Sequence, residues 1–288
     1  AGTTRYETGA SASFDSAEAT LTLPNAYAFH AMGGSISFWA SAEELSASGD
    51  VLSLGTADDA PLTAHVTADF DATAGLVAYS LALTDDAGGL ASLATPALTT
   101  AGWHKVVFSF GSSNLTAFVD GTCAASTTVA RTAFGGFLSG NRLGGGRAAV
   151  GLDLDDVAVW ARTFDADAAS NTLYSVLSGN EDALTFAFLF EDNDLAPTFA
   201  NVPRTATDRV SGRTFDAVHI LRATPGAPVL GTGVFAADST PVVYRQPDAS
   251  KPGYNPNEEH AFIASGAGGY YAWALRCDLN TDETSEPF

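Results

Sequence analysis

The chain has 288 residues, of which 46% are hydrophobic and 16% charged, and its formal net charge is -20. This length suits one large or two ordinary domains, and the apolar content is sufficient for a substantial core. Lysine and arginine total 13 against 33 aspartates and glutamates, which excludes a basic surface for nucleic acid. No stretch of 18 apolar residues occurs, so we expect no membrane-spanning helix.

Residues 10–178 consist of short apolar-polar alternating runs with turn signals between them, as in a β-sandwich. Apolar residues recur with period two in 104–110 and again in 115–119, and Gly111–Asn114 forms a turn cluster between the runs. This pattern predicts an antiparallel hairpin. Alternation returns in 152–160 but changes phase beside Asp155 and Asp156, which predicts a β-bulge.

A short helical pattern over 166–177 ends at Gly179, and the composition changes at 178–182. Beyond it, 184–190 is expected to be a buried strand, and the apolar runs 261–264 and 270–276 flank a glycine-rich turn. We therefore predict an all-β protein with two domains, 1–178 and 179–288, the second smaller and mostly β.

The order of several motifs resembles a known family. These are F-W-A at 38–40, W-H-K-V-V-F-S-F at 103–110, L-T-A-F-V-D-G at 115–121, R-L-G-G at 142–145 and L-D-D-V-A-V-W at 154–160. In this order they are similar to the concanavalin A-like lectin/glucanase jelly roll, in its laminin-G-like, pentraxin-like branch. The resemblance covers about residues 10 to 178 and implies an antiparallel jelly-roll sandwich.

The second region has a resemblance of its own. The strings P-G-Y-N-P-N-E-E-H-A and Y-A-W-A-L-R-C-D-L-N resemble a module of very large secreted bacterial surface proteins. This likeness implies an extracellular context and no chemistry. The chain carries no signal peptide, so we expect that it begins after processing or is an internal piece of a longer protein.

The family resemblance implies calcium, which jelly rolls of this type bind at sheet edges through carboxylates and carbonyl oxygens. It points to Asp153, Asp155 and Asp156, with Asp15 near the other end of the chain. Strand alternation places Asp155 and Asp156 on opposite faces, so at most one of the two is expected to bind. The alternative is that one aspartate caps the bulge and the other is solvated.

No catalytic constellation is present. Glycosidases on this fold use an E-x-D-x-x-E strand that sets two carboxylates on one face, and this string is absent. H-E-x-x-H and G-x-S-x-G are absent as well. Glu258 or Glu259 with Asp120 is the pairing a glycosidase would need, and we predict a protein that is not an enzyme.

Glycan binding needs exposed aromatic rings, and Tyr254, Tyr270 and Trp273 are our candidate ligand-binding residues, with Tyr27 also expected to be exposed. Trp39, Trp103 and Trp160 lie in strand motifs and are expected in the core.

The sequence contains two cysteines, Cys123 and Cys277. They form either one disulfide or two buried free thiols, and the sequence alone leaves both open.

These observations favour a non-catalytic extracellular binding or adhesion module of a larger secreted or cell-surface protein, with a structural calcium. Its partner would be a glycan, a surface protein or other copies of itself. The alternative is a structural spacer or a subunit of an extracellular fibre, whose edge strands pair with neighbours. A groove lined by aromatic and acidic side chains would favour the first hypothesis.

Overall fold

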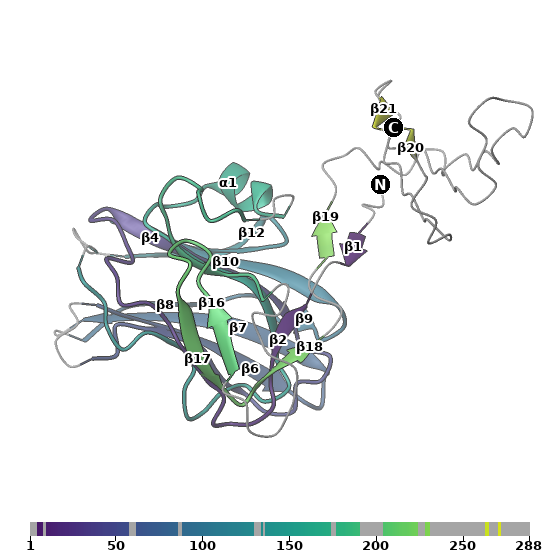
Figure 1. The fold of residues 1–288 in the computed structure, drawn as a ribbon. Helices are drawn as coiled ribbons and strands as arrows, with labels where there is room; N and C mark the ends of the chain where they lie inside the picture. The colour runs from purple at the N-terminus through teal and green to yellow at the C-terminus, as the bar shows by residue number, and fades with distance from the viewer. Residues whose placement is uncertain are drawn as a thin grey trace, which may run out of the picture. The chain divides into compact units, whose positions relative to one another are not determined.

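The structure is a computed structural model of the 288-residue chain. It describes residues 5–7, 10–57, 62–85, 88–129, 134, 136–173, 177–190, 204–223, 228–230, 263–264 and 270–271. Nearly all regular elements are strands, which confirms the predicted fold class, and two large antiparallel sheets form a sandwich (Figure 1). Among the described residues no helix is long and apolar enough to cross a membrane.

The first large sheet has eight strands. In spatial order its strands are β12 (Thr122–Thr128), β11 (Asn114–Val119), β10 (Trp103–Gly111), β4 (Gly33–Ser41), β14 (Asp153–Trp160), β2 (Ser11–Phe14) and β18 (Ile220–Ala223), with β15 (Leu184–Phe188) beside β14.

The second large sheet has nine strands. In spatial order they are β16 (Arg204–Thr207), β17 (Thr214–Val218), β3 (Thr20–Thr22), β13 (Arg142–Gly144), β5 (Gly49–Leu54), β6 (Thr63–Asp71), β7 (Leu76–Asp85) and β8 (Gly88–Ala94), with β9 (Leu98–Thr99) beside β7. The remaining elements are the helix α1 (Ala166–Asn171) and two small antiparallel pairs, β1 (Arg5–Glu7) with β19 (Pro228–Leu230) and β20 (Ile263–Ala264) with β21 (Tyr270–Tyr271).

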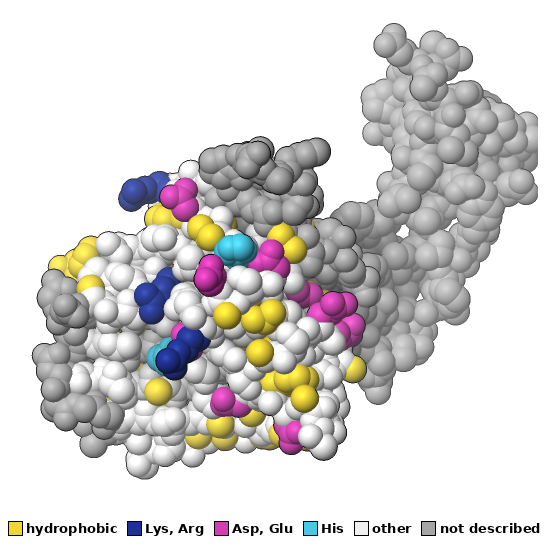
Figure 2. Space-filling view, turned by 90° about the horizontal axis from the view of Figure 1, so that it is seen from below, with side chains coloured by type: hydrophobic (Ala, Val, Ile, Leu, Met, Phe, Trp, Pro, Cys, Tyr) yellow, Lys and Arg dark blue, Asp and Glu magenta, His cyan; other side chains and the backbone are white. Residues whose placement is uncertain are grey.

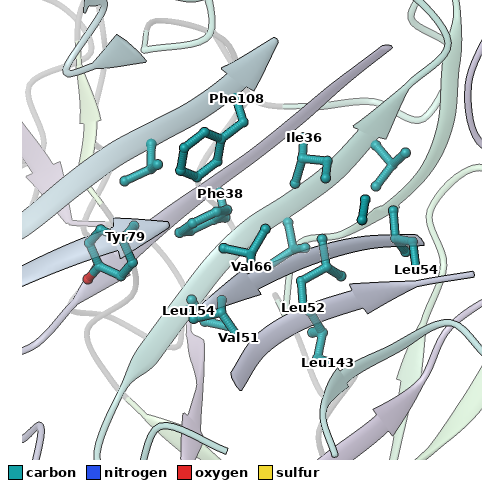
Figure 3. Packing of buried hydrophobic residues seen from close by; sticks show 14 of the residues in the cluster. Ile36, Phe38, Val51, Leu52, Leu54, Val66, Tyr79, Phe108, Leu143 and Leu154 are labelled. Atoms are coloured by element: carbon teal, nitrogen blue, oxygen red, sulfur yellow. The ribbon is translucent and has the colours of Figure 1, made fainter. Parts of the chain in front are cut away.

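The core lies between the two large sheets. Phe38 of β4 and Phe108 of β10 face Tyr79 of β7, and the rings of Phe38 and Tyr79 meet edge to face at 5.7 Å between centroids (Figure 3). The alternating residues of each strand supply this layer because successive side chains point to opposite faces of a sheet. At about 25 cal/mol per Å² of apolar surface, such a layer dominates the stability of the sandwich.

The local predictions between 103 and 160 are confirmed. β10 and β11 form the expected hairpin, with Val106 opposite Val119 and Phe110 opposite Leu115. The register of β14 against β4 shifts between Asp155 and Ala158, and Asp156 has a positive φ of 45°. This is the predicted bulge. The helical pattern yields only the short helix α1, whose N-cap Asp165 accepts from the backbone N–H of Ala168.

The boundary predicted at 178/179 differs from the structure, in which one compact unit spans Glu7–Val229 and a second contains Ala1–Tyr6 and Leu230–Phe288. Strands after 178 complete both large sheets: β15 pairs with β14, β17 with β3 and β18 with β2. His219, with φ 53°, lies between β17 in one sheet and β18 in the other. Backbone pairing across the two predicted domains therefore sets the size of the sandwich. In the second unit, the expected hairpin is confirmed for β20 and β21, where Ile263 pairs with Tyr271.

The outer faces of the two large sheets differ. In β4 and across most of β10 the residues of both faces are buried, because a second apolar cluster covers the eight-stranded sheet. Trp160, Phe164 and Leu184 belong to this cluster, and the hydroxyl of Ser35 donates to the carbonyl of Arg162 (2.8 Å). In β6 and β7, by contrast, buried residues alternate with half-exposed ones. Over these strands, the nine-stranded sheet therefore keeps a solvent-facing surface.

Candidate functional site

The candidate site is built on one cross-strand row of the nine-stranded sheet. Arg142 on β13 is directly opposite Ser53 on β5, Ser53 is opposite His65 on β6, and His65 is opposite Ala82 on β7. Directly opposed residues point to the same face, here the outer one, because their neighbours Leu52, Leu143 and Val66 belong to the core. The row therefore alternates long and short side chains along the sheet surface.

This alternation of long and short side chains leaves a pocket in the surface of the sheet. Ser53 is small and 3% exposed, so it forms a floor between the side chains of Arg142 and His65. The resulting pocket has a volume of about 280 Å³ and is completed by Asp50, Thr56, Thr63 and Thr84. This volume is at the lower end of the range for small-molecule sites, about 300 Å³ and upward. The lining is rich in hydroxyl, imidazole, carboxylate and guanidinium groups, which are hydrogen-bonding partners for a polyhydroxylated ligand.

Several polar groups of the pocket are held in place by the protein. Nε2 of His65 is 3.0 Å from Oδ1 of Asp50, and the Asp50 backbone is fixed by donation to the carbonyl of Arg147 (2.6 Å). The hydroxyl of Thr56 donates to the carbonyl of Gly140 (2.6 Å), and that of Thr63 to the carbonyl of Gly55 (2.8 Å). Each hydroxyl oxygen still has lone pairs available to accept from a ligand.

An exposed aromatic pair lies on two loops that are hydrogen-bonded to each other. Tyr27 is 71% and Phe137 48% exposed, and their rings meet edge to face at 5.4 Å. The pair is held by reciprocal backbone hydrogen bonds between Ala26 and Leu138 (3.1 and 2.8 Å). Large exposed rings are unusual on a soluble surface and suit stacking against an apolar sugar face. The expected exposure of Tyr27 is thus confirmed.

The side chain of Asn141 joins the aromatic loops to the pocket. Its Nδ2 donates to the carbonyls of Pro24 (2.8 Å) and Leu138 (3.0 Å), and its Oδ1 accepts from the backbone N–H of Gly55 (2.8 Å). Asn141 is 2% exposed, so these bonds are shielded from water. One buried amide therefore fixes the two loops that carry Tyr27 and Phe137 to the loop that carries Thr56.

A second pocket, of about 490 Å³, lies at the β10–β11 hairpin on the other sheet. Two of its polar groups serve the fold: the hydroxyl of Ser109 accepts from the backbone N–H of Phe164 (2.7 Å), and Asp165 caps α1. This second pocket is a weaker candidate, because no histidine or arginine lines it and it offers a narrower set of hydrogen-bonding groups.

The four carboxylates predicted to bind calcium are divided among different partners. Asp155 and Asp156 both interact with the ammonium of Lys105, which is 2% exposed. Oδ1 of Asp15 is 3.3 Å from Nδ1 of His219, and Asp153 interacts with Ser13. Because the bulge breaks strand alternation, the expected separation of Asp155 from Asp156 onto opposite faces does not prevent both from interacting with one lysine.

The electrostatics of this group are those of a buried ion cluster. Burial lowers the pKa of Lys105, and Asp156 and Asp155 act to raise it. Burial raises the pKa of Asp156, and Lys105 acts to lower it. Burial also raises the pKa of Asp153, against the hydrogen bond from Ser13 and with the help of the charges of Glu44 and Glu43.

These carboxylates do not fit a calcium ion well. Calcium takes six to eight oxygen ligands, whereas Asp155 and Asp156 already interact with the ammonium of Lys105. Within the described part of the chain, no group of three or more His, Cys, Asp or Glu side chains is placed to hold a metal. The described geometry therefore gives no support to calcium at these four carboxylates, and a calcium-dependent melting experiment is the test of that hypothesis.

The other predicted site residues have separate outcomes. Tyr254 and Trp273 lie outside the described residues, and Tyr270 begins β21, whose side chains are not described. Trp39 and Trp160 are each 3% exposed, so their expected burial is confirmed, whereas Trp103 at the start of β10 is only half-buried. Asp120, the acidic half of the glycosidase pairing, is 2.9 Å from Nδ1 of His104, and Glu258 and Glu259 lie outside the described residues.

The structure tests one part of the cysteine prediction. Cys123 lies exposed on β12, an edge strand of the eight-stranded sheet, so it is not a buried thiol. Cys277 lies outside the described residues, and its pairing with Cys123 stays a prediction.

The sequence did not predict the cross-strand row of Arg142, Ser53 and His65. His65 reads as an isolated histidine, and Arg142 appears only within a strand motif. Their positions 77 residues apart show no common motif, and only the register through Ser53 brings them together. Alternation in 63–71 shows that His65 faces away from the core, and this was the one available signal.

Comparison with known proteins agrees with the fold. A family model described as the concanavalin A-like lectin/glucanases superfamily, Laminin_G_3, matches residues 14–170. No curated protein matches the sequence.

Two solved structures illustrate the likeness. A putative carbohydrate binding protein from Bacteroides ovatus is 12% identical, with a TM-score of 0.54, over 78% of this chain and 62% of its own. A heptameric SAP-like pentraxin from Limulus polyphemus is 12% identical, with a TM-score of 0.46, over 79% of this chain and 97% of its own. The chain thus matches less than two thirds of the length of the Bacteroides protein, and at these identities the likeness concerns the fold.

Proposed function

Because the chain belongs to the Laminin_G_3 family of the concanavalin A-like lectin/glucanases superfamily, we propose that it is a non-catalytic carbohydrate-binding module whose glycan occupies the pocket over Ser53. The observation that carries this proposal is the combination of a rigid polar pocket with exposed aromatic rings on loops joined to it by Asn141. A sugar presents hydroxyls at its edge and C–H groups on its faces, and the two features match these two chemistries.

The placement on strands supports binding. Ser53, His65 and Arg142 come from neighbouring strands within a hydrogen-bonded sheet, so their spacing is fixed before the ligand arrives. Preorganisation of this kind reduces the entropy lost on binding. The Bacteroides protein, whose fold is similar, is described as a putative carbohydrate binding protein, which agrees with the proposal.

The proposal includes an extracellular setting and an adhesive role, in which the glycan belongs to a surface or a matrix. Hydrolysis is not part of it. Asp50 is the carboxylate that lines the pocket, and it is hydrogen-bonded to His65, whereas glycosidases need two carboxyl groups across the scissile bond.

A steric variant tests the site. Ser53→Leu places a branched side chain on the pocket floor, so binding in a glycan array should be lost. Ala78→Leu is the matched control, because Ala78 is half-exposed on β7, faces the same side and does not line the pocket. Equal binding by the Ser53→Leu variant, or no glycan bound by the unchanged protein, would contradict the proposal.

A further inference from the structure

Arg142 stands out among the pocket residues because, within the described part of the chain, it forms no ion pair and its buried Nε has no hydrogen-bond partner. Asp50 lines the same pocket, but its Oδ1 is directed at Nε2 of His65 (3.0 Å). A buried donor without an acceptor is unfavourable, and arginine is the side chain best suited to pairing with a carboxylate.

The side chain of Arg142 also packs against a glycine. Gly145 has φ +112°, and a Cβ built on it would lie 2.2 Å from Nε and 2.5 Å from Cδ of Arg142. The arginine side chain therefore lies against the glycine backbone, in space that the Cβ of any other residue would fill. Arginine has high rotamer entropy, so a side chain packed on one side loses less freedom when it binds.

From this geometry we infer that the pocket binds a sugar carrying a carboxylate, with the carboxylate on Arg142. This inference rests on the proposed function and names its ligand class. Because Nε is buried, the two terminal nitrogens of the planar guanidinium are the donors left for two carboxylate oxygens, a paired contact that a neutral hydroxyl cannot reproduce. The hydroxyls of Thr84, Thr56 and Thr63 then meet the remaining polar groups of the same sugar.

The net charge of -20 does not exclude such a ligand. At physiological salt the Debye length is about 8 Å, so the charges of distant carboxylates are largely screened. The groups nearest to the ligand therefore decide whether an acid group binds. A polyanion would need many cations along its length, whereas one carboxylate needs one guanidinium. On the face shown in Figure 2, Lys and Arg side chains are few, and some of them lie beside a histidine. The ligand is therefore a sugar with a single terminal acid group rather than a polyanionic chain.

Titration calorimetry on the full chain tests the inference with matched oligosaccharides. One set ends in a hexuronic acid and a second in a sialic acid, and each molecule is paired with its counterpart whose carboxyl is reduced to the alcohol. The acid of at least one set should bind about tenfold tighter or more than its reduced partner. The set that shows this preference identifies the source of the carboxylate.

Variants of Arg142 test whether this residue causes the preference for the acid over the alcohol. Arg142→Gln and Arg142→Ala should remove it, while Arg213→Ala, which makes the same charge change at an exposed residue outside the pocket, should keep it. Thermal melts show which of these variants are folded, and the milder Arg142→Gln serves if the alanine variant is not.

The outcomes separate the two proposals. If acid and alcohol bind equally, the inference fails and the carbohydrate-binding module stands. If the preference survives Arg142→Gln, the assignment to Arg142 fails. If neither member of any pair binds, and the glycan array is also empty, both proposals fail.

Discussion

Replacing Lys105 with methionine tests how the buried charges contribute to stability. Lys105 is 2% exposed on β10, opposite Trp39 of β4, and Asp155 of β14 is opposite Trp39 on its other side. The lysine Nζ is 5.6 Å from the centroid of the Trp39 ring. Lys105→Met keeps the approximate length of the side chain and removes the positive charge that faces Asp155 and Asp156. The buried Asp155 and the half-buried Asp156 then lose this counter-charge.

The expected loss of stability is large. Removing one partner of a buried ion pair costs about 3–5 kcal/mol, which is a substantial part of the about 5–15 kcal/mol that holds a domain folded. For a unit of this size, each kcal/mol lowers the melting temperature by roughly 2–4 °C. Urea unfolding at pH 7 measures the difference in free energy. A triple variant that adds Asp155→Leu and Asp156→Asn removes all three charges and should recover most of the loss.

The loss should depend on pH with a definite sign. In Lys105→Met the pKa of Asp156 is raised further, because burial remains and the opposing lysine is gone. A carboxyl whose folded pKa lies above its unfolded value costs stability at pH above the folded pKa, and the cost disappears as pH falls through it. The deficit of the variant is therefore full at neutral pH and shrinks toward pH 4. A deficit below about 1 kcal/mol at pH 7, or one that does not shrink in acid, would refute the reasoning.

Three further predictions concern the loops held by Asn141, the turn held by Asp208, and calcium. Asn141→Ala should destabilise the protein by about 3 kcal/mol in urea unfolding, because two carbonyls and one N–H lose their buried partner, and should weaken glycan binding as the loops separate. Asp208→Ala should cost about 3–5 kcal/mol in the same measurement, because this 1% exposed carboxylate accepts from the N–H groups of Ala187, Val210 and Ser211. A loss below about 1 kcal/mol would show that this turn does not contribute to the stability of the sandwich. Excess calcium should leave the melting temperature within about 1 °C of its value in chelator, whereas a site held at 100 times its dissociation constant would add about 2.7 kcal/mol and shift it by several degrees.

Local patterns determined the hairpin of β10 and β11, the turn at Asp120–Gly121 and the bulge at Asp155–Asp156. These features depend on residues close in sequence. The period of two shows which side chains share a face, and the positive φ of 49° at Asp120 and 75° at Gly121 suits the Asp-Gly pair. The family motifs likewise fixed the jelly roll, because each motif is a strand with its own turn.

Tertiary pairing decided what local patterns could not show. The sandwich extends to Val229 because β15 finds an open edge beside the second half of β14, a partner that no property of 184–188 alone indicates. The pocket arises in the same way, since Arg142, Ser53 and His65 become neighbours only through the register of β13, β5 and β6. A strand's own sequence sets which side of the sheet each residue faces, but the residues beside it come from distant parts of the chain, and pairing across those distances is fixed only when the whole core packs.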